Sequence, residues 1–316
     1  MNIQKPFLKW AGGKHKLLEH ITPLIPKEIE NYHEIFLGGG SVLLAVLSLQ
    51  KQNKITIKNK IYAYDLNKSL INCFKQVQKN AEKVYYLVSA LKQVFHSIEQ
   101  NTLLDEEGNI IKGSPNVDET NFMITREHYY YWIRHLFNTS SKTTLKSASY
   151  FIFLNKTGFK GMYRETKSGK FDIPYGLKDK EKKKKNKWEV GIIDKDEIKK
   201  ISELIQNVKF MCKDFEKSLK KVKKNDFMYL DPPYAPENKN SFVKYNKDGF
   251  GLDVHKSLFK HVHDLNKKNI KFVMSNSDVD LVNNEFSKYK IKYIMRRNAI
   301  HSKKPGTKAK EVIIHN

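Results

Sequence analysis

The chain has 316 residues, of which 40% are hydrophobic, so it can fold as one large α/β domain with a smaller inserted domain. Its longest uninterrupted apolar run, Val42 to Leu47, is too short to cross a bilayer, and the N-terminus lacks a secretory signal, so we expect a soluble, cytoplasmic protein without a membrane partner. The net charge of +24, from 58 Lys+Arg and 34 Asp+Glu, favours a polyanionic partner such as nucleic acid, although the strong preference for Lys is partly compositional bias.

The first part of the chain predicts the opening of a doubly wound sheet. A short amphipathic helix should begin near Lys14 and stop at Pro23 and Pro26. The segment NYHEIFLGGGSVLLAVLSLQ then has the pattern of a strand, a glycine turn and an apolar helix. KIYAYDLN predicts a second strand, with Asp65 at its carboxyl end. Strand, turn, helix and strand in this order are typical of an α/β fold.

From about residue 72 to 188 the pattern changes to long polar helices, predicted near 72–99 and 126–138. A segment rich in glycine, aromatic and basic residues follows, and we interpret residues 155–176 as a helix end and a β-hairpin that turns at Ser168 and Gly169. The lysine-rich run KDKEKKKKNKW is interpreted as a solvated loop, with transient phosphate contact as the alternative.

After Trp188 the α/β pattern returns. Strands are predicted in VKFMCKDF, FMYL, IKFVMSNSD, YKIKYIMRR and EVIIHN, and an amphipathic helix in VHKSLFKHVHDLNKK. The predicted fold is a Rossmann-like α/β sheet domain, residues 1–71 and 189–316, interrupted by a mostly helical insertion, residues 72–188, that carries the hairpin.

The glycine turn and the acidic residue after it suggest an adenosine-type cofactor. Gly38, Gly39 and Gly40 lie where a strand becomes a helix, and Asp65 ends the next strand, where a carboxylate can accept hydrogen bonds from ribose hydroxyls. This pair alone does not separate NAD from S-adenosylmethionine, and it could instead be a structural cap with an ordinary surface Asp. Leu43 stands where the dinucleotide fingerprint would have Gly or Ala, which disfavours NAD.

The turn Asp231-Pro232-Pro233-Tyr234 follows the apolar strand FMYL, at the edge of the sheet where α/β proteins bind ligands. The two prolines remove N–H donors, which leaves the Asp231 carboxylate and the Pro232 carbonyl as acceptors. Two acceptors on an exocyclic amine would localise its lone pair for attack on a sulfonium methyl. Tyr234 offers a ring on which a base can stack, a contact that contributes about 1–3 kcal/mol. The alternative is a rigid turn with no function.

Cysteine and arginine are both scarce. Cys73 and Cys212 are too few for a disulfide framework or a metal cluster, so we expect two small buried hydrophobic residues and no metal. Arginine has a planar fork that lysine lacks. Each retained arginine is therefore a candidate for bidentate recognition or a structural ion pair; the five are Arg126, Arg134, Arg164, Arg296 and Arg297.

Taken together, FLKWAGGK, EIFLGGGSVLL, TGFKGMYRETKSGKFDIPYG and YLDPPYAP resemble the Dam-type (alpha-class) DNA adenine methyltransferases, in that family's motif order and over nearly the whole chain. YYYWIRHLFN, FVMSNSD and the closing GTKAKEV add to the resemblance. It implies a methyltransferase sheet with an inserted target-recognition domain. It also implies S-adenosylmethionine as cofactor, double-stranded DNA as partner and a monomer. The enzyme would either have a cognate restriction endonuclease, not held in a complex, or be an orphan methyltransferase.

The resemblance assigns residues to roles. The catalytic residues would be Asp231, Pro232 and Tyr234. The cofactor contacts would be Trp10, Lys14, Phe36, Gly38, Gly40, Ser41, Asp65, Asp214, Phe215 and Asp231, with Asp214 and Phe215 flanking the adenine ring. From composition alone, Trp10 would pass as core packing and Lys14 as a solvated helix residue.

DNA would be contacted by Lys9, Phe159, Lys160, Met162 and Arg164. Phe159 and Tyr163 can wedge or stack, Lys160 can meet phosphate, and Arg164 can grip a guanine edge. A basic surface hairpin without this role is the alternative.

Three departures from the family pattern put the recognised sequence in doubt. The family commonly has Asn at the position of Lys160, RxN where this chain has Arg164-Glu165-Thr166, and often Asn at Asp172. GATC is the family default, and another short adenine-containing palindrome is the alternative.

The sequence thus predicts a site-specific DNA methyltransferase that flips an adenine out of the duplex and methylates its N6 atom. Three other functions stay open at this point. They are a methyltransferase for RNA adenine or a protein amide, an NAD-linked oxidoreductase, and a DNA-binding protein without catalysis.

Overall fold

The computed structural model describes residues 3–107, 110–111, 113–176, 191–236, 250–297 and 308–316. Two compact units divide the chain. One, here called the sheet unit, contains residues 1–4, 14–66 and 207–316. The other, the helical unit, contains residues 5–13 and 67–206. The boundaries differ from those predicted above, because residues 5–13, 67–71 and 189–206 cluster with the helical unit.

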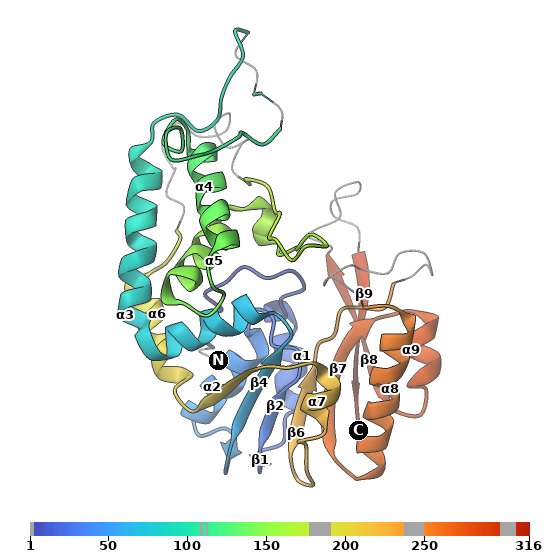
Figure 1. The fold of residues 1–316 in the computed structure, drawn as a ribbon. Coiled ribbons are helices and arrows are strands. Elements are labelled where there is room, and N and C mark those ends of the chain that lie inside the picture. Colours follow the sequence, from blue (N-terminus) through green and yellow to red (C-terminus); the bar gives the residue numbers. More distant parts are fainter. Residues whose placement is uncertain (1–2, 108–109, 112, 177–190, 237–249, 298–307) are drawn as a thin grey trace. The chain divides into compact units, whose positions relative to one another are not determined.

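In the described part of the sheet unit, seven strands form one sheet (Figure 1). Their order across the sheet is β5 (Val208–Cys212), β4 (Ile61–Asp65), β2 (Tyr32–Glu34), β6 (Phe227–Leu230), β7 (Lys271–Ser277), β9 (Lys308–His315) and β8 (Lys290–Arg297). The first five are parallel, and β9 runs antiparallel to both of its neighbours. A separate parallel pair joins β1 (Glu28–Ile29) to β3 (Thr56–Ile57).

The strands predicted from the sequence are present in this sheet, and their order locates a ligand-binding edge. The strand β2 lies between β4 and β6, so the chain winds outward from it in both directions. In parallel sheets, ligands bind at the carboxyl ends of strands beside such a switch point. The glycine turn follows β2, and Asp231 follows β6, so both predicted motifs lie at this edge.

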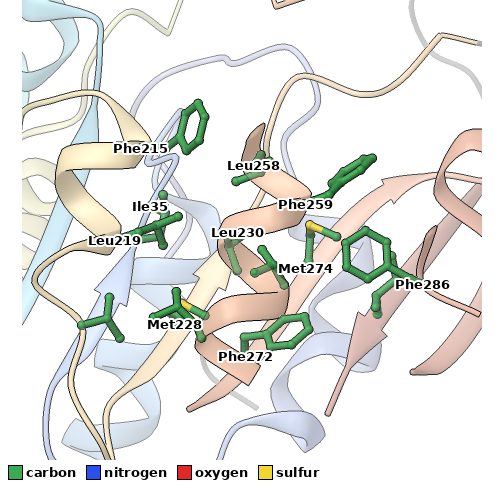
Figure 2. Packing of buried hydrophobic residues seen from close by; sticks show 14 of the residues in the cluster. Ile35, Phe215, Leu219, Met228, Leu230, Leu258, Phe259, Phe272, Met274 and Phe286 are labelled. Atoms are coloured by element: carbon green, nitrogen blue, oxygen red, sulfur yellow. The ribbon is translucent and has the colours of Figure 1, made fainter. Parts of the chain in front are cut away.

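Helices bury their apolar faces on the sheet. In α8 (Leu252–Lys267), Leu258, Phe259, Val262 and Leu265 recur at helical spacing and are all buried. They pack with apolar residues of β6 and β7, such as Met228 and Phe272, in the cluster shown in Figure 2. The short helices α7 (Phe215–Leu219) and α9 (Asp280–Glu285) add to it, through Leu219 and Val282. By contrast, α2 (Ser41–Lys51) is buried from Ser41 to Leu49.

The first segment of the sheet unit is less regular than predicted. It forms three short elements, η1 (His15–Leu17), α1 (Leu18–Ile21) and η2 (Thr22–Leu24). Pro23 lies inside η2, near its start, because proline lacks an N–H but fits the first turn of a helix. The helical run therefore continues through Pro23 and ends at Leu24, before Pro26, so of the two predicted stops only the second is confirmed.

The helical unit contains α3 (Lys68–Ser97), α4 (Arg126–Thr139), α5 (Leu145–Thr157) and α6 (Lys195–Leu204). The side chains of Asn67, Thr125, Thr144 and Asp194 cap their first turns. The helix α3 packs against α5 and α6, and α4 packs against α5. Both long helices predicted in this region are present.

The predicted hairpin is present as a short reversal after α5 and the turn η3 (Phe159–Gly161). Gly169 N–H donates to Thr166 O at the predicted turn, and Glu165 pairs with Phe171 in an isolated antiparallel bridge. Because these pairs are isolated, the segment has no regular strands. The lysine-rich run at 178–188 lies outside the described residues.

The prediction for the two cysteines is half right. Cys73 is buried, whereas Cys212 is exposed. Cys212 is the last residue of β5, the edge strand of the sheet, and it is exposed although Val208 and Phe210, on the same face of the strand, are buried. No helix in the described part of the chain is both long and apolar enough to span a membrane.

Candidate active site and nucleic-acid surface

The glycine turn joins β2 to α2 through two left-handed residues. Gly38 has φ 49° and Gly40 has φ 73°, which residues with a Cβ atom rarely adopt. Asp65 stabilises the turn, since its Oδ2 accepts a hydrogen bond from Gly38 N at 3.0 Å. The N-cap residue of α2 is Gly40, which has no side chain, and the Glu34 carboxyl accepts a hydrogen bond from Leu43 N–H in the first turn. A helix N-terminus of this kind attracts negatively charged or acceptor groups, because its first N–H groups point outward.

Two aromatic rings stand beside this turn in the sheet unit. The centroid of Phe36 lies 6.0 Å from that of Phe215, and both residues belong to or pack against the same core cluster. Asp214 caps α7, accepting from Lys217 N at 2.8 Å. Burial raises the pKa of Asp214, but the hydrogen bonds and the charge of Lys217 outweigh it and lower the pKa overall. Asp214 is therefore a fixed carboxylate next to an aromatic pair.

The DPPY turn is paired with a lysine from the N-terminal segment. Lys14 Nζ lies 2.7 Å from Asp231 Oδ1, and the Lys14 side chain is only 3% exposed. The same ammonium group lies 4.7 Å from the centroid of the Tyr234 ring. A cation over the face of an aromatic ring is attracted by its quadrupole. Lys14 thus contacts both the carboxylate and the ring of the turn, which composition alone would not have suggested.

Four more side chains fix the turn. His255 Nε2 lies 3.1 Å from Pro233 O, and Tyr234 donates its hydroxyl to Glu311 Oε2 at 2.8 Å. Ala235 N donates to Asn276 Oδ1 at 3.1 Å, and Ser277 Oγ donates to Ala235 O. Burial raises the pKa of Tyr234 well above 10, and the charges of Asp231 and Glu311 raise it further, so the hydroxyl stays a donor.

Sequence reasoning gave these four residues no role. Asn276 and Ser277 lie in FVMSNSD, and Glu311 lies just after GTKAK. Both segments resembled family motifs, which was the only available signal. The contacts of Asn276, Ser277 and Glu311 with the turn depend on the pairing of β7 with β9, which places Ser277 opposite Glu311.

A second carboxylate is buried close to the turn. Glu34 ends β2, is 2% exposed, and accepts a hydrogen bond from the hydroxyl of Tyr32. Burial raises the pKa of Glu34 to about 8, although the bonds from Tyr32 and from Leu43 N–H lower it, and the charge of Asp231 raises it further. A protonated Glu34 would leave Asp231 as the charged acid of the pair.

In the helical unit, the proposed DNA-contacting residues are mostly exposed. Phe159 is 42% exposed, and Lys160, with φ 52°, lies with its Nζ 5.2 Å from the Phe159 ring centroid. Arg164 Nε donates to Asp172 Oδ1 at 2.8 Å. This ion pair raises the pKa of Arg164 and occupies one donor of the fork. Met162 is half-buried, and its N–H donates to Phe159 O.

Trp10 and Tyr163 contact each other in the helical unit. Their ring centroids are 6.0 Å apart, with planes 23° from parallel, and Phe151 packs on both. Tyr163 also donates its hydroxyl to Glu165. Tyr163 is therefore half-buried against Trp10, so of the two aromatic residues predicted to wedge or stack, Phe159 is the more accessible.

Two other arginines have structural roles. Arg126 is buried, and its Nε donates to the carbonyls of Phe95 and Ile98 at the end of α3. Arg134 lies over the Tyr131 ring. Among the arginines described in the helical unit, Arg164 is the one whose side chain is exposed.

A model of the D12 class N6 adenine-specific DNA methyltransferases matches residues 10–300, which is most of the chain. The chain belongs to this family. The methyltransferase is similar along nearly its whole length to several curated proteins. It is 35% identical to the Type II methyltransferase M.MjaIII of Methanocaldococcus jannaschii, over 98% of this chain and 96% of the relative.

Other relatives carry two kinds of name. The Type II methyltransferase M1.LlaDCHI of Lactococcus lactis subsp. cremoris is 28% identical, over 99% of this chain and 95% of the relative. The DNA adenine methylase of Escherichia coli (strain K12) is 27% identical, over 98% of this chain and 94% of the relative. The methyltransferase is therefore an adenine-specific DNA-modifying enzyme, and the oxidoreductase and non-catalytic hypotheses are wrong.

Proposed function

We propose that the enzyme uses S-adenosylmethionine to methylate adenine N6 in a short duplex site, with the DPPY turn as its catalytic element. The observation that carries this proposal is the placement of Asp231 and Tyr234, each held by a charged side chain, at the carboxyl edge of the sheet beside the glycine turn. S-adenosylmethionine would supply an electrophilic methyl group on a sulfonium.

The residues at this edge fit such a cofactor. The N-terminus of α2, with Gly40 as its N-cap, would attract a carboxylate, Asp65 at the end of β4 would accept ribose hydroxyls, and Phe36 and Phe215 offer apolar faces for an adenine ring. Asp214 is a fixed acceptor next to them. Trp10, Gly38, Gly40 and Ser41 remain proposed contacts through the family resemblance.

The chain's own groups would prepare the amine. The Asp231 carboxylate and the Pro232 carbonyl accept its two hydrogens, which favours a pyramidal nitrogen with a localised lone pair. The Tyr234 ring supports the base from one face, with its hydroxyl fixed by Glu311. Because the target atom is inaccessible inside a duplex, the base must be flipped out, with Phe159 as the residue to fill the gap.

DNA recognition would come from Lys9, Phe159, Lys160, Met162 and Arg164 in the helical unit. GATC is the proposed default site, and another short palindrome is the alternative. Because two of the relatives are named Type II methyltransferases, we also propose a cognate restriction endonuclease that acts separately.

The test is methyl transfer from isotope-labelled S-adenosylmethionine by the purified full-length enzyme, with mixed-sequence duplex DNA, RNA and peptide assayed side by side. We expect labelled N6-methyladenine in DNA alone. Label in RNA or peptide, or transfer to a cytosine, would overturn the proposal. Sequencing the modified DNA would then give the recognised site.

A further inference from the structure

Asn155, a buried residue at the end of α5, holds together two segments that are far apart in the sequence. Its Oδ1 accepts a hydrogen bond from Lys9 N at 2.8 Å, and its Nδ2 donates to Lys9 O at 2.7 Å. The same Nδ2 donates to Gly161 O at 3.2 Å. Asn155 is 4% exposed, so these bonds form away from solvent, where leaving them unmade costs about 1–3 kcal/mol each.

The two segments are also in close van der Waals contact. Gly161 has φ 64°, and a Cβ atom built on it would lie 2.5 Å from Lys9 Cβ. The Lys9 side chain therefore packs directly on the turn Phe159–Gly161. Lys9 itself is exposed, and its Nζ lies 3.4 Å from Lys156 O at the carboxyl end of α5, where a cation is favoured.

We infer that Asn155 is a positioning residue for DNA recognition, which fixes Lys9 and the Phe159–Arg164 loop as one reading surface. This inference rests on the proposed function. An amide that bonds both the N–H and the C=O of Lys9 restricts the backbone from which this side chain extends. The backbone of Lys9 therefore has a defined position relative to the loop, and the readout of a base edge depends on such a position because base contacts carry the sequence specificity.

Asn138 provides a matched control. It makes the same two bonds to a different backbone, since Nδ2 donates to Phe171 O at 3.0 Å and Phe171 N donates to Oδ1 at 2.9 Å. Phe171 precedes Asp172, the partner of Arg164. Removal of the Asn138 amide should therefore affect recognition by Arg164 and leave recognition by Lys9 unchanged.

The experiment measures kcat/KM of the full-length enzyme on the recognised duplex and on duplexes with one base pair changed at each position. The variants are Lys9→Ala, Asn155→Ala, Asn155→Asp, Gly161→Ala and Asn138→Ala. Asn155→Asp can still accept from Lys9 N but places a carboxylate against two carbonyls. Gly161→Ala keeps the Asn155 side chain, and its Cβ would meet Lys9 Cβ at 2.5 Å and Asn155 O at 3.2 Å, so its main effect is to displace Lys9 directly.

We expect Lys9→Ala, Asn155→Ala, Asn155→Asp and Gly161→Ala to lose discrimination at the same base pair, by about 5- to 150-fold, the value of one specific base contact. Adding Asn155→Ala to Lys9→Ala should not relax that position further. Asn138→Ala should keep discrimination at that base pair. Each variant is checked for its melting temperature and for binding of labelled S-adenosylmethionine, so that an unfolded variant is recognised.

Two results would overturn the inference while the proposed function stands. One is an Asn155 variant that loses activity equally on all duplexes, and the other is a loss of discrimination at a position that Lys9→Ala does not affect. If the wild-type enzyme methylates no adenine in duplex DNA, the proposed function itself fails. The wild-type assay therefore separates the two failures.

Discussion

The ammonium group of Lys14 lies 2.7 Å from Asp231 Oδ1, and it also lies over the ring of Tyr234. One buried cation thus contacts the carboxylate proposed to bind the target amine and the ring proposed to support the base. The pair fixes the carboxylate at the edge of the sheet, before any substrate is bound. A preorganised acceptor of this kind needs no rearrangement when the reaction begins.

Asp231→Ala should abolish methyl transfer, with kcat reduced at least about a hundredfold, the usual cost of removing one preorganised group. The fold should persist, because Asp231 is a partly exposed residue in a turn held by other contacts. Isotope transfer to duplex DNA and the melting temperature measure the two effects. Full activity in this variant would remove the DPPY turn from the mechanism.

Lys14→Met should lower kcat/KM at least about tenfold and destabilise the fold by about 1–3 kcal/mol, because the carboxylate of Asp231 loses its cation. Lys16→Met is the control, since Lys16 is exposed two residues later. In an Asp231→Ala background, Lys14→Met should cost little more stability. A stability loss that is the same in both backgrounds would mean that Lys14 does not act through Asp231.

Glu311→Gln and Tyr234→Phe should each lower kcat by a similar factor, because each removes or weakens the bond that fixes the Tyr234 ring. The double variant should be no worse than either single one. Tyr234→Ala should be more severe, because it also removes stacking that contributes about 1–3 kcal/mol. Additive losses in the double variant would show that the two side chains act independently.

Arg164→Lys should lose discrimination at one base pair by about 5- to 150-fold, because lysine cannot bind a base edge bidentately. Asp172→Asn should instead raise DNA affinity across all sequences, since it removes a negative charge that pairs with Arg164. Binding to duplexes with single base-pair changes, at two salt concentrations, measures both. A uniform loss in Arg164→Lys would identify Arg164 as a phosphate contact.

Glu34 should make the enzyme less stable in alkaline solution. Burial raises its pKa from 4.5 in the unfolded chain to about 8 in the fold, so the folded state binds the proton more tightly. The stabilisation is fully present below about pH 4.5 and is lost as the pH rises through about 8. It amounts to at most a few kcal/mol, at about 1.4 kcal/mol for each pKa unit.

Glu34→Gln should therefore flatten the fall in melting temperature between about pH 4.5 and pH 8, because the amide does not ionise. Glu19→Gln, at an exposed glutamate of the same unit, should leave the pH dependence as in the wild type. If Glu34→Gln and the wild type lose stability in parallel over this range, the ionisation of Glu34 does not destabilise the folded state, and the expectation is wrong.

The sequence by itself determined the elements and the positions of the two principal motifs. Alternating and continuous apolar runs predicted the strands. The glycines after β2 can adopt the left-handed conformations of a turn, and the two prolines after β6 lack the N–H groups that would continue a strand. The family resemblance is confirmed by the match over residues 10–300. Each of these features depends on residues close together in the chain.

Only the tertiary structure decided which distant residues support those motifs. The contacts of Lys14 with Asp231, of Glu311 with Tyr234 and of Asn155 with Lys9 join residues that no local pattern relates. The same holds for Cys212, which is exposed at the end of the edge strand β5 while Val208 and Phe210 of that strand are buried. Strand order and helix packing bring such residues within hydrogen-bond distance, and these depend on the burial of the whole core, for which a short window of sequence carries no signal.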